Sequence, residues 1–284
     1  MKTYSSTPGT ERLKPVNCPV CGRSDGRPDW NCGTFSFLKC AGCGHVYQNP
    51  QPEFDDLRQR YQDEYFSYEL SNEEAFFKLM VLGLADIRFE SYEEDLKRKG
   101  TFLDIGCATG RLLAHMQDRG WKVQGVELCR ASAEYGMKTR GVPIFIGPLE
   151  EAAFARESFS VIHFSHLIEH VPDPRSFLIK VRELLLPEGH AVIVTPNRKG
   201  FQARLLGTKW RSCIADHVHL FSPDGLGRLL EETGFNIVKT QTWGGIAKDL
   251  APDFVKIPVD RLAKRFGFGD VMLFHARRSR SQPN

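Results

Sequence analysis

The stretch that most constrains the fold runs from Thr101 to Leu113 and reads TFLDIGCATGRLL. Its first five residues favour a strand, two glycines follow, and an amphipathic segment begins at Arg111, so the order is strand, turn and helix. Gly106 and Gly110 have no Cβ, which lets the backbone turn sharply and approach a ligand closely. The first turn of the following helix would direct its N–H groups at that ligand. The stretch therefore predicts a nucleotide-binding turn in an α/β sheet.

Two acidic residues flank this turn. Glu127 ends the next β-prone run, about 20 residues further on, where a carboxylate can accept hydrogen bonds from ribose hydroxyls. Asp104 lies near the end of the first strand, and a carboxylate there suits a positively charged amino-acid group better than a pyrophosphate. The spacing from Gly106 to Gly110 also differs from the dinucleotide fingerprint. The pattern therefore favours a nucleoside that carries an amino-acid moiety.

The turn resembles the first motif of the class I S-adenosylmethionine-dependent methyltransferases, which runs hydrophobic-hydrophobic-Asp-x-Gly-x-Gly-x-Gly. Ala108 replaces the middle glycine of that motif. A glycine turn in an unrelated α/β protein is the competing interpretation. The resemblance implies S-adenosylmethionine as cofactor and a Rossmann-like, seven-stranded methyltransferase sheet of the α/β class. It implies a cofactor site made of the residues at the turn and at the neighbouring strand ends, namely Asp104, Gly106, Cys107, Ala108, Gly110, Glu127, Leu128, Leu149 and Ser165.

The adenine end of this predicted site departs from the family pattern. Members often have an aspartate one residue after the glycine that follows the third strand, and that aspartate reaches the adenine amino group. Here Gly147 is followed by Pro148, which cannot take this role. The backbone at Leu149 and the carboxylate of Glu150 are the alternatives.

The length of 284 residues suffices for one α/β domain and a small accessory module. A formal charge of +3 is too mild to imply a nucleic-acid or membrane partner. The first 15 residues lack the apolar core of a signal peptide, and no apolar run approaches the roughly 20 residues of a membrane span. We therefore expect a cytoplasmic protein whose eight cysteines are metal ligands or buried thiols, not disulfides.

Two cysteine pairs lie close to the N-terminus. Cys18 and Cys21 form the first pair, and after 18 intervening residues Cys40 and Cys43 form the second. This spacing matches the paired knuckles of a four-cysteine zinc ribbon. Four thiolates complete a tetrahedral shell, so we predict a structural Zn²⁺, with a catalytic zinc and a redox pair as alternatives. Cys32, between the knuckles, is predicted to take no part.

The rest of the chain alternates between helical and β-prone segments. We predict a zinc ribbon at 1–50, a helical linker or lid at 51–99 and a methyltransferase domain at 100–284. The linker is expected to form one helix over 53–68, whose aromatic stripe either packs on the main domain or covers the substrate, and a second over 72–99. The alternation predicts a parallel sheet with right-handed crossovers, and the family resemblance adds an antiparallel seventh strand. Strands are expected at 101–105, 122–127, 141–146, 159–164, 190–195, 235–243 and 270–276, and helices at 111–119, 131–140, 177–186, 222–234 and within 248–266.

Residues after the fourth strand could carry the chemistry. The sulfonium of S-adenosylmethionine is already a strong electrophile, so the protein must align a nucleophile and, where needed, accept its proton. His166 directly follows the strand and is the candidate for contact with the substrate, with a role as the base as a further alternative. His166, Glu169 and His170 resemble the Glu-x-x-Glu-His stretch of the ubiquinone-biosynthesis O-methyltransferases, a triplet associated there with a divalent metal. In the alternative, Glu169 and His170 orient a loop and cap the next helix without metal.

A third polar stretch, DHVHLFSP, begins at Asp216. His217 and His219 are two residues apart on an extended segment and can therefore point the same way, which makes both of them candidate catalytic residues. The alternative is a pair of histidines hydrogen-bonded into the turn that precedes the helix. His163, between apolar neighbours on the fourth strand, is predicted to be a packed core residue. The loop 198–213 is expected to cover the cleft.

Taken together, the cysteine pairs, the glycine turn, EHVPDP and HVHLFSP resemble bacterial zinc-ribbon methyltransferases of the methyltransferase-23 type. The resemblance implies O-, N- or C-methylation of a small-molecule metabolite or biosynthetic intermediate. An RNA base methyltransferase that reads RNA through the ribbon is the alternative, although SHLI follows the fourth strand in place of Asn/Asp-Pro-Pro-aromatic. A ligand-binding adaptor without turnover is a third interpretation. The sequence predicts no particular oligomeric state.

Overall fold

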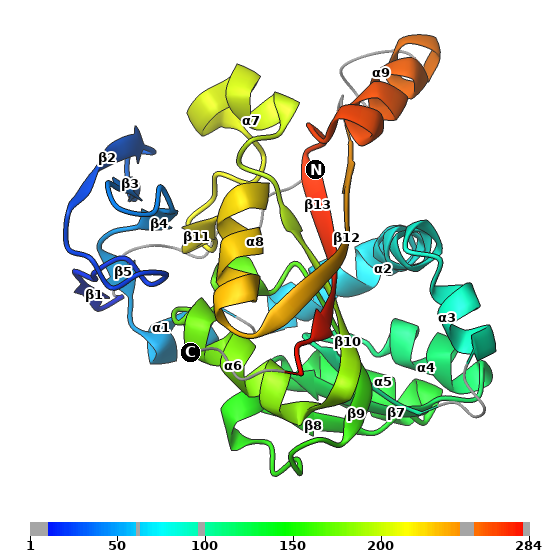
Figure 1. Ribbon diagram of the computed structural model, residues 1–284. Helices are drawn as coiled ribbons and strands as arrows, with labels where there is room; N and C mark the ends of the chain where they lie inside the picture. Colours follow the sequence, from blue (N-terminus) through cyan, green and yellow to red (C-terminus); the bar gives the residue numbers. More distant parts are fainter. Residues whose placement is uncertain (1–10, 61–62, 96–99, 245–252, 281–284) are drawn as a thin grey trace.

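The computed structural model describes residues 11–60, 63–95, 100–244 and 253–280, and a seven-stranded sheet forms its centre (Figure 1). The strand order is β12-β13-β10-β9-β6-β7-β8. Strands β6 to β10 pair in parallel, and β13 is antiparallel to both β10 and β12, as predicted for a methyltransferase sheet. The strands are β6 (Thr101–Ile105), β7 (Lys122–Glu127), β8 (Ile144–Ile146), β9 (Phe159–Ser165), β10 (Leu185–Pro196), β12 (Phe235–Trp243) and β13 (Val271–Arg278).

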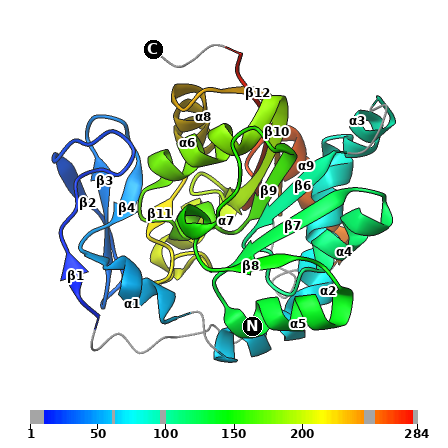
Figure 2. The same ribbon diagram turned by 90° about the horizontal axis from the view of Figure 1, so that it is seen from below.

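Helices cover both faces of this sheet (Figure 2). The central strand β6 shows why, because its alternating side chains enter two different cores. Phe102 packs with residues of the helices on one face, and Leu103 packs with residues of the helices on the other. Both side chains are fully buried. The first face carries α2 (Asp63–Asp86), α3 (Phe89–Asp95), α4 (Arg111–Asp118) and α5 (Arg130–Arg140), and the second carries α6 (Pro174–Leu184) and α8 (Pro223–Glu232).

The helical linker differs from its prediction. Helix α1 (Phe54–Arg58) is short, and α2 runs without a break through 69–71, where the sequence analysis separated two helices. The described break lies at Arg88, whose φ of +56° is incompatible with a continuous helix. Apolar spacing gave no signal for this break, because a single left-handed residue leaves the periodicity on both sides intact. The predicted end at Lys99 and the aromatic Tyr61 lie outside the described residues.

Three other boundaries shift. The third strand, β8, is shorter than 141–146, and α6 begins at Pro174 because the Asp173 carboxylate caps it by accepting from the Ser176 N–H. The segment 187–189 was expected to be a turn but lies within β10, where the pairing with β9 shifts register between Leu185 and His190. Helix α9 (Asp253–Phe266) confirms the helical part of the insertion, and residues 248–252 lie outside the described chain.

The ribbon is a small antiparallel sheet that continues into the main domain. Strands β2 (Gly26–Asn31), β3 (Ser36–Cys40) and β4 (Val46–Gln48) come from the ribbon, and β11 (His219–Leu220) adds a fourth strand beside β4. Strand β1 (Leu13–Lys14) pairs with β5 (Gln51–Pro52). A strand of the main domain and three strands of the ribbon thus share one hydrogen-bonded sheet.

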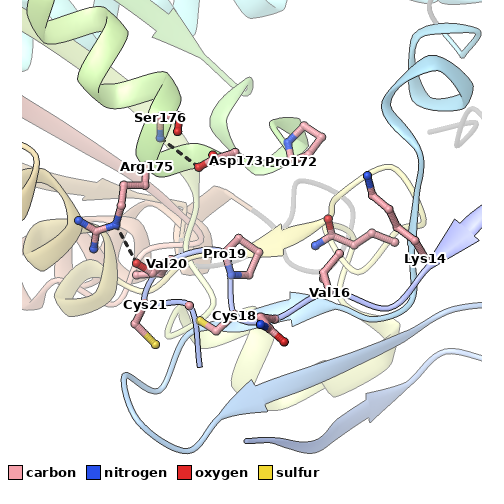
Figure 3. A pocket seen from close by; sticks show the side chains of 13 residues that line it. Lys14, Val16, Cys18, Pro19, Val20, Cys21, Pro172, Asp173, Arg175 and Ser176 are labelled. Atoms are coloured by element: carbon pink, nitrogen blue, oxygen red, sulfur yellow. Dashed lines mark hydrogen bonds between the residues drawn. The ribbon is translucent and has the colours of Figure 1, made fainter. Parts of the chain in front are cut away.

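Side chains of the main domain also reach the cysteine knuckles. Arg175 Nε donates to the Val20 carbonyl at 2.9 Å, and Arg228 Nη2 donates to the Cys43 carbonyl at 2.9 Å. The first of these contacts borders a groove of about 630 Å³ between the first knuckle and the start of α6 (Figure 3). Cys32 was predicted to take no part in zinc binding, and its Sγ lies 2.9 Å from the Sγ of Cys213 in the main domain.

Helices α7 (Phe201–Leu206) and α9 rise beyond the carboxyl end of β10 (Figure 1). Trp210 follows α7 and is buried, and its indole N–H donates to Asp270 at the start of β13. Among the described residues, no helix is both long enough and apolar enough to cross a bilayer.

Candidate functional site

The carboxyl ends of β6, β7, β8 and β9 meet at one edge of the sheet, where ligands of open α/β sheets bind. All of the predicted cofactor residues lie within or directly beyond the ends of these strands. Cys107 and Leu149 are buried there, Leu149 in the short helix η1 (Leu149–Glu151). Ser165 ends β9, and Leu128 directly follows β7.

The turn after β6 requires its glycines. Gly106 and Gly110 have φ values of +72° and +71°, a region that residues with a Cβ rarely adopt. A Cβ on Gly110 would lie 2.8 Å from Val142 Cγ2, and one on Gly106 would lie 3.3 Å from Leu167 Cδ1. Ala108 also has a positive φ, +46°, at a cost of roughly 1–2 kcal/mol. The middle glycine of the motif is therefore replaced without loss of the left-handed turn.

Glu127 stabilises this turn directly. Its Oε2 accepts the Ala108 N–H at 2.9 Å, and its Oε1 accepts the Cys129 N–H at 2.8 Å. The side chain is buried, and burial raises the pKa of Glu127 although these backbone N–H groups oppose the rise. The carboxylate therefore links the end of β7 to the turn after β6, the position at which a ribose is expected.

Asp104 points to a partner within the sheet. Its Oδ1 lies 2.7 Å from Nδ1 of His163 on the neighbouring strand β9, and both side chains are buried. His163 is thus a core residue, as predicted. The Asp104 carboxylate lies beneath the glycine turn, and its contact with the amino-acid end of the cofactor stays a prediction.

Helix α2 contacts the glycine turn. The sequence analysis did not predict this contact. Glu73 accepts hydrogen bonds from the Thr109 hydroxyl, inside the turn, and from Arg140 Nη2 at 2.7 Å. Two turns earlier, Phe66 contacts Tyr135 with ring centroids 5.6 Å apart. Glu69 lies between them on the helix, and its pKa rises to about 7 because of burial and of the nearby Glu127 charge. The predicted lid helix 53–68 ended before Glu69 and Glu73, so their i,i+4 spacing was not used.

His166 occupies a constrained position beside the turn. It directly follows β9, has a φ of +52°, and its N–H donates to the Val194 carbonyl on β10 at 2.8 Å. Its side chain is 45% exposed, and its Nδ1 lies 3.2 Å from Oε1 of Glu169. The Thr195 hydroxyl donates to the other carboxylate oxygen at 2.9 Å. A histidine oriented by a buried carboxylate is an arrangement suited to proton transfer.

The Glu169 carboxylate is kept ionised. Its side chain is 1% exposed, and burial alone would raise its pKa. The neighbouring His166, His170 and His217 imidazoles oppose this effect of burial and lower the pKa of Glu169 to about 2.

His170 and His217 lie beside this carboxylate. The ligand atoms of Glu169, His170 and His217 all lie within 4.8 Å of one another. His170 Nδ1 donates to the Asp216 carbonyl at 2.8 Å, and His217 Nδ1 donates to the Ser212 carbonyl at 2.8 Å. Each ring therefore carries its lone pair on Nε2, the tautomer found when a backbone carbonyl orients a metal-ligating histidine. Two imidazoles and one carboxylate are a donor set that fits a divalent cation.

His219 lies on the same side of its segment as His217 but has different partners. Its Nε2 lies 2.9 Å from the Val171 carbonyl, and its Nδ1 lies 3.1 Å from Nε2 of His45 in the ribbon. The side chain is 0% exposed. Both histidines thus bond to backbone carbonyls outside the turn that precedes α8, His217 to Ser212 and His219 to Val171.

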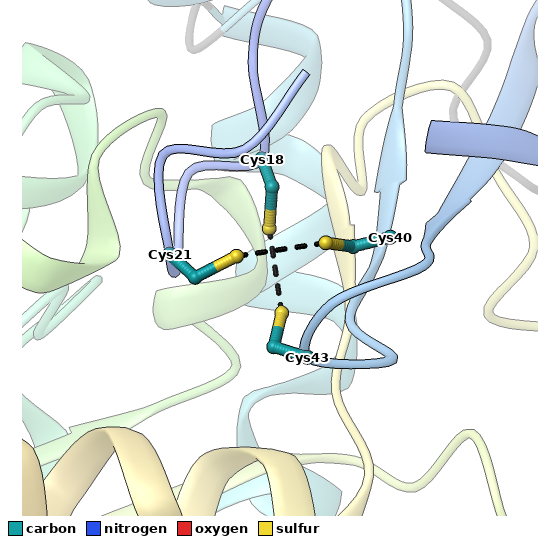
Figure 4. Close-up of side chains that lie close together, drawn as sticks. All are labelled: Cys18, Cys21, Cys40 and Cys43. Atoms are coloured by element: carbon teal, nitrogen blue, oxygen red, sulfur yellow. Dashed lines mark hydrogen bonds between the residues drawn. The ribbon is translucent and has the colours of Figure 1, made fainter. Parts of the chain in front are cut away.

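The four knuckle cysteines surround one point (Figure 4). The Sγ atoms of Cys18 and Cys43 are 3.5 Å apart, and so are those of Cys21 and Cys40. Four sulfurs at the usual zinc distance of about 2.3 Å would be separated by about 3.8 Å in a tetrahedron. All four atoms lie within 4.8 Å of one another, so the cluster has the dimensions of a four-cysteine zinc shell.

Comparison with known families identifies the main domain. The profile of a methyltransferase domain family matches residues 82–240, which is more than half of the chain. The chain belongs to this methyltransferase family. Together with the relatives below, this makes it an S-adenosylmethionine-dependent methyltransferase, as predicted from the glycine turn.

Curated relatives match about half of this methyltransferase. A ubiquinone biosynthesis O-methyltransferase from Cereibacter sphaeroides is 30% identical over 180 residues, which is 56% of this chain and 73% of the relative. A protein of the same name from Chromobacterium violaceum is 28% identical over 157 residues, 51% of this chain and 66% of the relative.

Solved structures share the fold. A methyltransferase from Thermotoga maritima, described as a possible histamine N-methyltransferase, superposes with a TM-score of 0.55 at 22% identity, over 75% of this chain and 98% of that one. An S-adenosylmethionine-dependent methyltransferase from Archaeoglobus fulgidus gives 0.53 at 19% identity, over 76% of this chain and all of that one. At these identities the likeness demonstrates the architecture alone.

Replacement of Glu127 by alanine should weaken S-adenosylmethionine binding by roughly 1–3 kcal/mol, because the variant loses both the predicted ribose acceptor and the hydrogen bonds that shape the turn. Calorimetric titration with the cofactor measures this change. Glu134→Ala, on the exposed part of α5, is the matched control. Unchanged affinity in the Glu127 variant would remove the residue from the cofactor site.

Acidification should destabilise the fold through its buried neutral histidines. Burial lowers the pKa of His219 to about 4, so its contribution to stability is complete above the ordinary pKa near 6.5 and is lost as the pH falls toward 4. Between pH 7 and pH 5 this residue should account for up to about 2 kcal/mol of lost unfolding free energy. Urea denaturation at both pH values tests this, because His219→Phe should show a smaller loss than the wild type. Equal losses in both proteins would contradict the assignment.

Proposed function

We propose that this methyltransferase transfers the methyl group of S-adenosylmethionine to an oxygen, nitrogen or carbon atom of a small-molecule acceptor. The observation that carries the proposal is the His166–Glu169 pair beside the glycine turn. A Cβ on Gly106 would touch Leu167, so the segment that carries His166 lies directly against the predicted cofactor site. The names of the relatives, ubiquinone biosynthesis O-methyltransferases, support a small-molecule acceptor.

In this proposal His166 is the general base. Because Nδ1 faces the ionised Glu169, it carries the ring proton, and Nε2 presents its lone pair to the half-exposed side of the ring. Nε2 accepts the proton from an acceptor O–H or N–H while the acceptor atom bonds to the methyl carbon. S-adenosylmethionine, when bound, would supply this methyl group, and the electron pair of its carbon–sulfur bond would leave on sulfur as neutral S-adenosylhomocysteine. Thr195 fixes Glu169, and Glu169 fixes the tautomer of His166.

The cofactor is assigned to the strand ends that were predicted from the sequence. Glu127 would accept the ribose hydroxyls, and the backbone from Gly106 to Gly110 would approach the amino-acid portion. Glu69 and Glu73 on α2 close the site from the opposite side, since Glu73 bonds to the turn itself. The raised pKa of Glu69 gives it a carboxyl that can ionise when the cationic sulfonium binds nearby.

We also propose a structural Zn²⁺ at the four knuckle cysteines. The sulfur separations support it, and a ribbon of this size has too small an apolar core to fold by burial alone.

A divalent cation at Glu169, His170 and His217 is the second candidate for promoting proton loss. The proximity of the three ligand atoms favours it, as do the backbone carbonyls that orient both imidazoles. A cation there would act as a Lewis acid toward an acceptor hydroxyl.

His166→Gln should lower methyl transfer by roughly 10²–10⁴-fold, the usual contribution of a general base, while cofactor affinity stays near the wild-type value. The assay uses labelled S-adenosylmethionine with a bacterial extract separated into small-molecule, RNA and protein fractions. His115→Gln, on α4 away from the turn, is the control. An unaltered rate excludes His166 as the base, and label confined to RNA would replace the small-molecule proposal by the RNA alternative.

Cys40→Ser should abolish zinc retention and destabilise the ribbon while S-adenosylmethionine affinity is kept, because the cofactor site is built from the main sheet. Metal content is measured by mass spectrometry on purified protein. Cys32→Ser, outside the four-sulfur cluster, should keep one zinc per chain. Full zinc retention by Cys40→Ser contradicts the proposed ligand. A second metal equivalent that survives this change and is lost in Glu169→Gln would support the cation site.

A further inference from the structure

A chain of hydrogen bonds joins the zinc ribbon to the turn that contains Glu169. The Cys40 backbone N–H donates to the His45 carbonyl at 2.9 Å, and Nε2 of the His45 ring lies 3.1 Å from Nδ1 of the His219 ring. The opposite nitrogen of His219 lies 2.9 Å from the Val171 carbonyl, at the end of the helical turn η2 (Ile168–His170). The chain therefore runs from a predicted zinc ligand to the residue next to His170.

The last acceptor in this chain of hydrogen bonds fixes the direction of each bond before it. A carbonyl oxygen can only accept, so Nε2 of His219 carries a proton and donates it to Val171. In the neutral ring Nδ1 of His219 then carries a lone pair, and it accepts the Nε2–H of His45. Both rings are buried, and a charge on either ring would have no solvent to stabilise it at this contact. The pair has a single arrangement of protons that satisfies every partner.

Backbone pairing follows the same path. His219 pairs with Tyr47 in the β11–β4 ladder, and the Gln48 N–H donates to the Val218 carbonyl at 2.9 Å. The Val218 N–H in turn donates to the Glu169 carbonyl at 2.9 Å. One side of residue 218 is therefore bonded to the ribbon and the other side to the proposed catalytic turn. A displacement of the ribbon strand would be transmitted to Glu169 through one residue.

Aromatic packing closes the space around this contact. The His45 ring lies 4.9 Å from the Phe221 ring and 5.1 Å from the His219 ring, and it stacks on Tyr47. His45 and His219 are both buried, so no solvent replaces a lost hydrogen bond at this position.

We propose that His45 is a positioning residue for methyl transfer, which holds the Glu169–Val171 turn in place through His219. The inference rests on the proposed function, because the turn matters for rate only if Glu169 orients the catalytic base. His219, which the sequence predicted to be catalytic, acts in this account through Val171 and does not touch the substrate. The ribbon is thereby part of the active-site scaffold, and its zinc fixes the strand that carries the contact.

The test compares three variants that separate the hydrogen bond from the volume of the ring. His45→Leu removes the donor, and His45→Gln retains an amide N–H at the position of Nε2. His219→Phe removes the same link from the other side and leaves every residue of the ribbon unchanged. Each variant is assayed for zinc content, S-adenosylmethionine affinity, kcat in the labelled-methyl assay, and hydrogen exchange at the Val218 amide.

We expect His45→Leu and His219→Phe to keep one zinc per chain and wild-type cofactor affinity, while kcat falls about tenfold or more, since sub-ångström displacement of a catalytic group is costly. Exchange at the Val218 amide should accelerate in both variants, and His45→Gln should recover most of kcat and of the protection.

Three results would overturn the proposal. The first is wild-type kcat in both apolar variants. The second is a loss of zinc or of cofactor affinity that parallels kcat in both, which indicates general destabilisation. The third is a His45→Gln protein as slow as His45→Leu. If the wild type transfers no methyl group to any fraction, the proposed function fails. The positioning claim is then decided by hydrogen exchange alone, and unchanged protection of the Val218 amide in zinc-bound His45→Leu overturns it.

Discussion

The buried carboxylate of Glu127 is the interaction on which the rest of the site depends. It bonds to the N–H groups of Ala108 and Cys129, and so connects the ends of β6 and β7 at the point where the glycine turn must hold its left-handed residues. The left-handed conformation of Ala108 is costly for an isolated chain, and the hydrogen bond from its N–H to Glu127 offsets that cost. Helix α2 completes the arrangement, because Glu73 bonds to Thr109 from the other side. The glycine turn is therefore stabilised by Glu127 from within the sheet and by Glu73 from helix α2.

A second set of interactions builds the proposed acceptor side. Glu169 lies at the centre, with Thr195 on one oxygen and His166 beside the other. The neighbouring imidazoles lower the pKa of Glu169 against the effect of burial, whereas burial itself lowers the pKa of His217 to about 3 and that of His219 to about 4. The ribbon contributes to this side through the β4–β11 pairing. A ribbon that shares a sheet with the catalytic segment is better described as scaffold than as a tethered recognition module.

Much of this arrangement was predictable, and the misses have specific causes. The order of the strands and the positions of Asp104, Gly106, Glu127 and His166 at the sheet edge follow from local patterns, because a strand, a turn and a helix are encoded within about a dozen residues. The boundary between the linker helices was predicted at the wrong place, because the break at Arg88 does not interrupt the apolar periodicity. The sequence analysis did not identify Glu69 and Glu73 as site residues, because carboxylates on a predicted helix are expected to face solvent. Only the packing of α2 on the glycine turn brings them to the site.

The sequence by itself determined the α/β class, the methyltransferase turn and the two cysteine knuckles, since each of these is set by residue type and short spacing. The tertiary structure alone decided which distant residues meet. It brought His45 to His219 across 174 positions, Cys32 to Cys213 across 181, and Glu73 to Thr109 across 36. No local sequence pattern specifies these contacts, because they depend on how helices and strands that are far apart in the sequence pack against one another. The chemistry of the turn was encoded locally, and the support that makes the turn rigid was decided by the fold.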